Sequence, residues 1–168
     1  MTFDPEAAEA DLLQAAGMGL GPHLVGAAPI LGGISLQAVG VGWATVELDR
    51  AATELSSSAG YTVARAEPDM LLGATARIGR RRSGGPLAVL LEPFTEGRLA
   101  AFLARHGEAP AALYLAPSEG GLDALLGALA AAGIPTRAGT GPLGPAALVL
   151  GRPADEPQLV LVAVPSEA

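Results

Sequence analysis

The segment Ala38–Val46 (AVGVGWATV), followed directly by Glu47–Ala52 (ELDRAA), decides the fold. Alternating small and bulky residues in its first part are typical of a β-strand, and the acidic start of its second part indicates a helix. The same order recurs at Ala111–Ala116 (AALYLA), which precedes a helix predicted over Leu122–Ala132. A strand-helix order that recurs along one chain indicates two copies of one structural unit.

Each of these openings is followed by three further strand patterns. The sequence therefore predicts an α+β fold in which tandem βαβββ modules form a curved mixed sheet with an open cavity. The predicted strands are 36–46, 61–66, 71–79 and 87–91 around a helix at 47–58, then 111–116, a short strand near Thr136, 146–150 and 158–164.

Four regions are predicted along the chain. Residues 1–35 form an N-terminal arm, with a helix from about Pro5 to Gly17 and then a Gly- and Pro-rich irregular stretch. Residues 36–94 form the first module, 95–110 a connecting helix, and 111–168 the second module. The second helix is predicted to stop at Gly133, because Pro135 cannot continue it.

Composition excludes several kinds of chemistry. The 168-residue chain has a net charge of −7, ten basic residues that are all Arg, and no Cys. The acidic balance argues against nucleic acid and against an anionic membrane. Thiol nucleophiles, thiolate metal sites and lysine Schiff bases are excluded, and His23 and His106 are the only imidazoles. An acidic N-terminus and the absence of a long apolar run predict a cytoplasmic protein.

The two faces of the first strand differ in size. Side chains alternate along a strand, so Val39, Val41 and Trp43 share a bulky face that we expect to pack on the following helix. The opposite face carries the small residues Ala38, Gly40, Gly42 and Ala44. Either these residues allow close backbone packing, or they leave space for a bulky ligand.

The second opening shows a similar asymmetry. Leu113 and Leu115 are expected to face the helix, with Ala112, Tyr114 and Ala116 opposite. Tyr114 is then the one large side chain with a polar tip on a small face. Its hydroxyl could bind a ligand, or the ring could fill core space and reach a backbone partner.

Several segments carry a family resemblance. They are the strand Val39–Val46 with its helix start, the middle segments Leu90–Pro93 and Phe102–Glu108, the helix end Ala124–Ile134 and the closing Leu159–Val162. Together with the repeat order they resemble the epimerase-like branch of the vicinal oxygen chelate superfamily. This superfamily includes glyoxalase I, methylmalonyl-CoA epimerase, extradiol dioxygenases and bleomycin-resistance proteins. The resemblance covers about Leu36 to Pro165.

The resemblance also implies where metal ligands would stand. The superfamily's chemistry normally depends on four ligands, one from each of four strands, and the matching positions here are Gly40, Val89, Ala112 and Leu161. None of these side chains can donate to a metal. The resemblance therefore implies a roomy, metal-free and cofactor-free pocket lined by Gly40, Gly42, Val89, Ala112, Leu161 and Thr75.

Polar groups near the expected pocket are few. Tyr114, Glu92 and Arg77 are the candidate catalytic residues, with Asp69 near another predicted strand end. The loop Arg80–Arg82 is a charged hairpin tip that is either solvated or holds a phosphate or carboxylate. His106 ends a helix, where its charge would suit the helix dipole.

Two functions remain open on these grounds. We favour a metal-independent enzyme that isomerises, epimerises, cyclises or eliminates on a small apolar metabolite, for example in secondary metabolism. The alternative is a non-catalytic binder of the bleomycin-resistance type, and a metal-dependent epimerase is disfavoured. A small-molecule ligand is the expected partner, and a homodimer is compatible with the resemblance.

Overall fold

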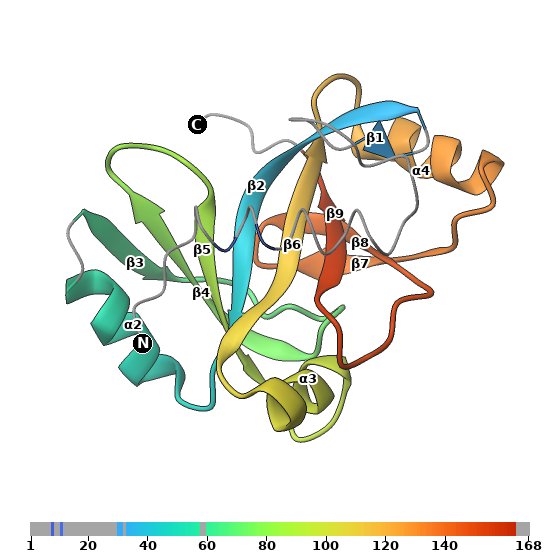
Figure 1. Cartoon of the computed structure of the whole chain (residues 1–168). Coiled ribbons are helices and arrows are strands. Elements are labelled where there is room, and N and C mark those ends of the chain that lie inside the picture. The colour runs from blue at the N-terminus through green and yellow to red at the C-terminus, as the bar shows by residue number, and fades with distance from the viewer. Residues whose placement is uncertain (1–7, 9–10, 12–29, 32, 58–59, 164–168) are drawn as a thin grey trace.

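The secondary structure follows the predicted repeat. The computed structural model describes residues 8, 11, 30–31, 33–57 and 60–163 (Figure 1). Along the chain its elements are β1 (Ile30–Leu31), β2 (Ile34–Ala44), α2 (Leu48–Ser57), β3 (Tyr61–Arg65), β4 (Ala74–Arg81), β5 (Leu87–Pro93), α3 (Arg98–His106), β6 (Ala109–Pro117), α4 (Leu122–Ala131), β7 (Thr136–Gly141), β8 (Gly144–Val149) and β9 (Gln158–Val162). The predicted helix at 5–17 and the arm that follows it lie almost wholly outside the described residues. Among the described helices none is long and apolar enough to cross a lipid bilayer.

One continuous sheet joins the two repeats. Its strand order is β3-β4-β5-β2-β6-β9-β8-β7, and β1 pairs with β2 beside this path. Each half comes from one repeat, and the halves meet where β2 runs antiparallel to β6. Within the halves, β2 is parallel to β5 and β6 is parallel to β9. The predicted α+β mixed sheet is therefore confirmed.

The helices α2 and α4 cover the outer face of this sheet. Trp43 and Leu90 pack with Leu48 and Leu55 of α2, as the parity of the first strand predicts. Leu113 and Leu115 pack with Leu125 and Leu129 of α4, which confirms the faces predicted for the second opening. In Figure 1, α2 lies beside the half that contains β3 and β4, and α3 lies at the lower end of β2 and β6.

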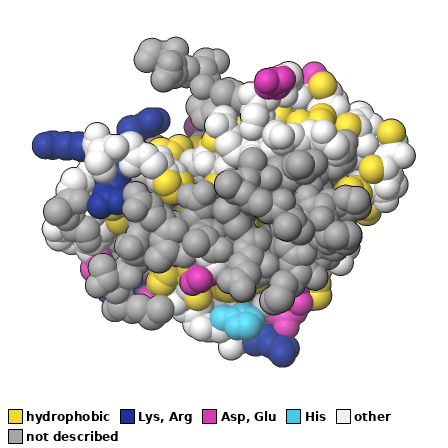
Figure 2. All heavy atoms as spheres, turned by 45° about the horizontal axis from the view of Figure 1, so that its top comes forward, with side chains coloured by type: hydrophobic (Ala, Val, Ile, Leu, Met, Phe, Trp, Pro, Cys, Tyr) yellow, Lys and Arg dark blue, Asp and Glu magenta, His cyan; other side chains and the backbone are white. Residues whose placement is uncertain are grey.

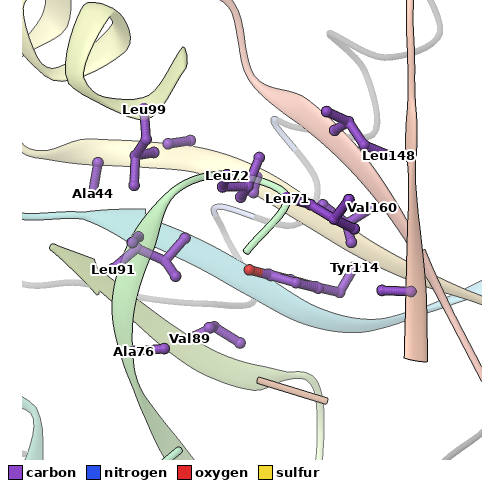
Figure 3. Packing of buried hydrophobic residues seen from close by; sticks show 14 of the residues in the cluster. Ala44, Leu71, Leu72, Ala76, Val89, Leu91, Leu99, Tyr114, Leu148 and Val160 are labelled. Atoms are coloured by element: carbon purple, nitrogen blue, oxygen red, sulfur yellow. The ribbon is translucent and has the colours of Figure 1, made fainter. Parts of the chain in front are cut away.

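The inner face of the sheet carries a third set of apolar residues, called here the inner cluster. It takes side chains from both halves of the sheet, from α3 and from the turn before β4 (Figure 3). Its buried members are Ala44, Leu71, Leu72, Ala74, Ala76, Val89, Leu91, Leu99, Phe102, Ala111, Ala112, Tyr114, Ala116, Ala146, Leu148, Val160 and Val162.

Two predictions about strands are wrong in detail. Val39 packs against the inner cluster instead of the helix side, because the β2–β6 register shifts between Ala38 and Gly40. Such a bulge places an extra residue on one strand and breaks the alternation of faces. The strand predicted from Leu71 begins only at Ala74. The residues before it form a turn that ends at Gly73, whose φ of 71° favours glycine.

Candidate functional site

The inner face of the sheet is the first candidate site, because the small residues of β2 lie on it. A Cβ added at Gly42 would lie 2.8 Å from the Cβ of Ala112 and 3.0 Å from Cδ1 of Leu91. At Gly40 it would lie 3.4 Å from Cγ2 of Val89. The small residues therefore allow close packing, and the open space predicted beside Gly42 is filled by side chains in this structure.

A buried acid and a buried phenol meet on this face. Tyr114 of β6 donates a hydrogen bond of 2.7 Å from its hydroxyl to Oδ2 of Asp69. Both residues are 0% exposed. The other oxygen of Asp69 accepts hydrogen bonds from the backbone N–H groups of Leu71 (3.0 Å) and Leu72 (2.8 Å). Figure 3 shows the Tyr114 ring in the middle of the inner cluster.

Burial governs the acidity of both groups. Desolvation raises the pKa of Asp69, although the hydrogen bonds from Tyr114, Leu72 and Leu71 oppose this rise. Desolvation, with the charge and the hydrogen bond of Asp69, raises the pKa of Tyr114 well above its ordinary value. A carboxyl group with a raised pKa, held by a phenol in an apolar setting, can store or transfer a proton.

Asp69 belongs to the segment Glu67–Gly73, called here the closing loop, which also brings Leu71 and Leu72 into the inner cluster. It extends from the first half of the chain to the edge strand β7 of the second half. The backbone N–H of Met70 donates to the carbonyl of Thr140 at 3.1 Å, and Arg137 donates to the carbonyl of Leu71 at 2.7 Å. A Cβ added at Gly139 would lie 2.7 Å from Cδ2 of Leu71, so glycine permits this contact.

The other predicted catalytic residues lie on the outer face. Oε2 of Glu92 accepts a hydrogen bond of 2.9 Å from the backbone N–H of Leu48 at the start of α2. Thr75 donates weakly to the carbonyl of Glu92 at 3.5 Å, and Arg77 forms an ion pair with Asp49 of α2. The contacts of Glu92 and Arg77 hold the first turn of α2. The structure therefore does not bring Glu92, Arg77 and Thr75 together with Tyr114.

The predicted lining residues divide between the two faces. Val89 and Ala112 belong to the inner cluster, and Gly40 faces Val89. Leu161 lies on the outer face, where it packs with Leu125 and Leu129 of α4. Its neighbours Val160 and Val162 are the β9 residues of the inner face. Leu161 therefore does not line the inner face, and the β9 residues that do are equally unable to bind a metal.

Two buried polar side chains near the inner face were not predicted. Gln158, at 2% exposure, pairs in register with Ala112, and Arg152, at 8%, lies in the preceding loop. Gln158 donates to the carbonyls of Pro153 and Glu156, and Arg152 donates to the carbonyl of Pro157. Nη1 of Arg152 and Oε1 of Gln158 have no partner among the described residues. The sequence feature that could have indicated a buried polar group here is the glutamine directly before the apolar run Leu159–Val162.

The remaining charged features are at the surface. Arg80 and Arg82 are exposed on and beside β4, and dark blue side chains gather at the left of Figure 2, the side on which β3 and β4 lie in Figure 1. His106 contacts the carbonyl of Asp155 at 2.7 Å at the end of α3. In the described part of the chain no three His, Cys, Asp or Glu side chains are grouped so that they could hold a metal ion.

A cavity of about 540 Å³ lies at the surface, away from the inner cluster. Its lining comes from the start of β2 and the turn after β6: Gly33, Ile34, Ser35, Ser118, Glu119 and Gly120. None of the candidate catalytic residues lines it. This cavity is therefore not the pocket that the small residues of β2 predicted.

Comparison with known proteins identifies the fold. No family model and no curated protein matches the sequence. Methylmalonyl-CoA epimerase from Mycobacterium tuberculosis is similar in structure, with a TM-score of 0.65 and 21% identity over 77% of this chain and 87% of that chain. The epimerase from Streptomyces coelicolor, in complex with 2-nitronate-propionyl-CoA, has a TM-score of 0.62 and 16% identity over 78% of this chain and 95% of that chain. A hypothetical protein from Bacillus halodurans has a TM-score of 0.59 and 15% identity over 75% of this chain and 92% of that chain. The chain has the vicinal oxygen chelate fold, as its sequence predicts.

Proposed function

We propose that the protein binds a small, largely apolar metabolite on the inner face and moves a proton on it without a metal, as an isomerase, epimerase, cyclase or lyase. The observation that carries this proposal is the pair of Asp69 and Tyr114, which hydrogen bond at 2.7 Å and are both fully buried. A carboxyl group without a cationic partner is unfavourable in an apolar core. Buried acids with shifted pKa values are concentrated at functional sites.

The two groups would have distinct roles. Asp69, with its raised pKa, would remove or deliver a proton on a ligand carbon. Tyr114, whose pKa is also raised, stays protonated and donates a hydrogen bond. It could stabilise the carboxylate or a ligand oxygen on which charge develops. This arrangement requires no cofactor.

A metal-dependent epimerase reaction is the less favoured alternative. The inner-face residues at the positions compared with metal ligands are Gly40, Val89 and Ala112, with Val160 on β9. Their side chains offer no oxygen, nitrogen or thiolate donor. A stoichiometric divalent ion in the purified protein would support the metal-dependent reaction if activity is lost when the ion is removed and regained when it is added back.

A non-catalytic binder is the second candidate, and one observation favours it. Both oxygens of Asp69 already have partners, and Leu71 and Leu72 lie in the inner cluster beside them. A protein that only sequesters a ligand needs apolar space and one orienting hydrogen bond, and no free acid. The same fold could then bind a drug or metabolite and release it unchanged.

A ligand screen in two stages tests these functions. Thermal-shift measurements on the full chain would use apolar metabolites and acyl-CoA compounds, the latter because a structural neighbour binds 2-nitronate-propionyl-CoA. Each stabilising compound would then be incubated with wild type, Asp69→Asn and Tyr114→Phe, and analysed by mass spectrometry. An enzyme gives a product that the Asp69→Asn variant fails to form, whereas a binder returns the compound unchanged. Light scattering of the same samples tests whether the chain forms the homodimer that the resemblance allows.

A further inference from the structure

The closing loop carries two leucines into the inner face. Leu71 is 5% exposed and Leu72 is 2% exposed, and both belong to the inner cluster with Tyr114. Met70, between Asp69 and these leucines, is 61% exposed. The loop therefore inserts one apolar side and leaves the other in solvent.

The interactions that hold this loop on β7 are few. Among the described residues the hydrogen bonds from the loop to the second half are those of Met70 to Thr140, Arg137 to Leu71 and Tyr114 to Asp69. Pro68 stands near one end of the loop and Gly73, with a φ of 71°, at the other. β7 is an edge strand that pairs only with β8 in the sheet. The loop can therefore leave β7 without breaking the sheet.

We propose that Leu71 and Leu72 occupy the ligand position of the inner face, and that residues 70–73 of the closing loop move away from β7 to admit the ligand while Asp69 stays beside Tyr114. The ligand would be neutral and apolar, about as large as two leucine side chains, with one oxygen that accepts a hydrogen bond from Tyr114. This inference rests on the proposed function, since it takes the inner face to be the binding site.

The chemistry of the inner face supports this ligand class. Its members are aliphatic or aromatic, and the buried carboxyl of Asp69 opposes an anionic ligand group next to it. Outward movement of Leu71 and Leu72 would take their backbone N–H groups away from Oδ1 of Asp69 and leave this oxygen free to face the ligand.

A disulfide can lock the loop, because the chain contains no cysteine. A Cβ at position 139 would lie 3.1 Å from Cγ of Leu71, which is the place of a sulfur in Leu71→Cys. A disulfide sets the distance from one Cβ to the opposite sulfur at about 3 Å. The double variant L71C/G139C is therefore expected to close the loop when oxidised and to free it when reduced. The matched control is A64C/I78C, at paired positions of β3 and β4.

The binding probe is 2,6-dimethylheptan-4-one, in which a carbonyl joins two isobutyl groups like those of leucine. Titration calorimetry on the full chain should show that reduced L71C/G139C binds this ketone at least about tenfold more tightly than the oxidised form. A64C/I78C should bind it equally in both states. Equal binding by the two forms of L71C/G139C overturns the proposal, and so does a failure of both wild type and the reduced variant to bind.

Hydrogen exchange on the wild type gives a second reading that needs no disulfide. With the ketone present, amides of the closing loop should exchange faster while those of α2 stay unchanged. An unchanged loop under saturating ketone contradicts the opening. Neither measurement requires turnover, so a binder without catalysis would still pass both, whereas the proposed acid–base function would fail separately in the mass-spectrometric screen.

Discussion

Tyr114 and Asp69 come from opposite halves of the chain and hydrogen bond at 2.7 Å in a core where both are 0% exposed. Tyr114 lies on β6 of the second repeat, and Asp69 begins the turn that leads into β4 of the first. This hydrogen bond therefore joins the two repeats across the inner face. It also places the polar tip of a phenol against an acid whose pKa is raised by burial.

The buried carboxyl makes stability depend on pH in a defined direction. The pKa of Asp69 is higher in the folded than in the unfolded chain, so its contribution is complete below the unfolded pKa and is lost as pH rises through the folded pKa. Urea unfolding of wild type and Asp69→Asn should show that the stability of wild type relative to the variant falls between acid and alkaline pH. A difference that stays constant or grows with pH contradicts the raised pKa.

Removing the phenolic hydroxyl should weaken the fold most where Asp69 is charged. Tyr114→Phe leaves Oδ2 of Asp69 without its side-chain donor, and we expect a loss of about 1–3 kcal/mol of unfolding free energy. The loss should be larger at alkaline than at acid pH, because the Tyr114 hydrogen bond lowers the pKa of Asp69. The same substitution in an Asp69→Asn background is the control. An equal loss in both backgrounds would place the effect outside this hydrogen bond.

Gly42 should tolerate no added methyl group. A Cβ there meets Ala112 at 2.8 Å and Leu91 at 3.0 Å, so Gly42→Ala is expected to destabilise the protein by about 1–3 kcal/mol. Gly127→Ala is the matched control, because nothing lies within 4 Å of that position in α4. There the added helix propensity should stabilise by about 0.5–1 kcal/mol. A neutral Gly42→Ala variant would show that the inner face is looser than described.

Glu108 should have the opposite pH dependence. Partial burial opposes the shift, but hydrogen bonds from Thr45 and Arg50 and from the backbone of Val46 lower the pKa of Glu108. Its stabilising contribution is therefore present above the unfolded pKa and is lost as pH falls through the folded pKa. Glu108→Gln should destabilise the chain at neutral pH and have little effect at strongly acid pH. Chemical denaturation at the two pH values measures this difference.

Much of the fold could be predicted from the repeat order and from the alternation of side chains along the strands. The βαβββ order, the burial of Trp43 under α2 and the division of β6 between Leu113 outside and Tyr114 inside all follow from alternation of side chains. The alternation failed at Val39, where one extra residue in β2 shifts the register with β6. A bulge leaves no clear signal in a run of small apolar residues.

The site was harder to predict, because it depends on contacts between distant segments. Leu71 fits a strand by composition, yet Asp69 accepts the N–H groups of Leu71 and Leu72 and turns the chain inward. Glu92 resembles a catalytic acid at a strand end, but it accepts the first free N–H of α2. Tyr114 was recognised as the polar tip of a small face, whereas its pairing with Asp69 required the structure.

The most direct test of the proposed acid–base site is transfer of solvent deuterium. A compound that stabilises the protein in the thermal-shift screen would be incubated with the full chain in D₂O and its isotope content measured by mass spectrometry. The account predicts that wild type introduces deuterium at a carbon of the ligand and that Asp69→Asn, folded and still able to bind, does not. Deuterium transfer by Asp69→Asn at the wild-type rate would contradict the assignment of Asp69 as the proton-transferring group.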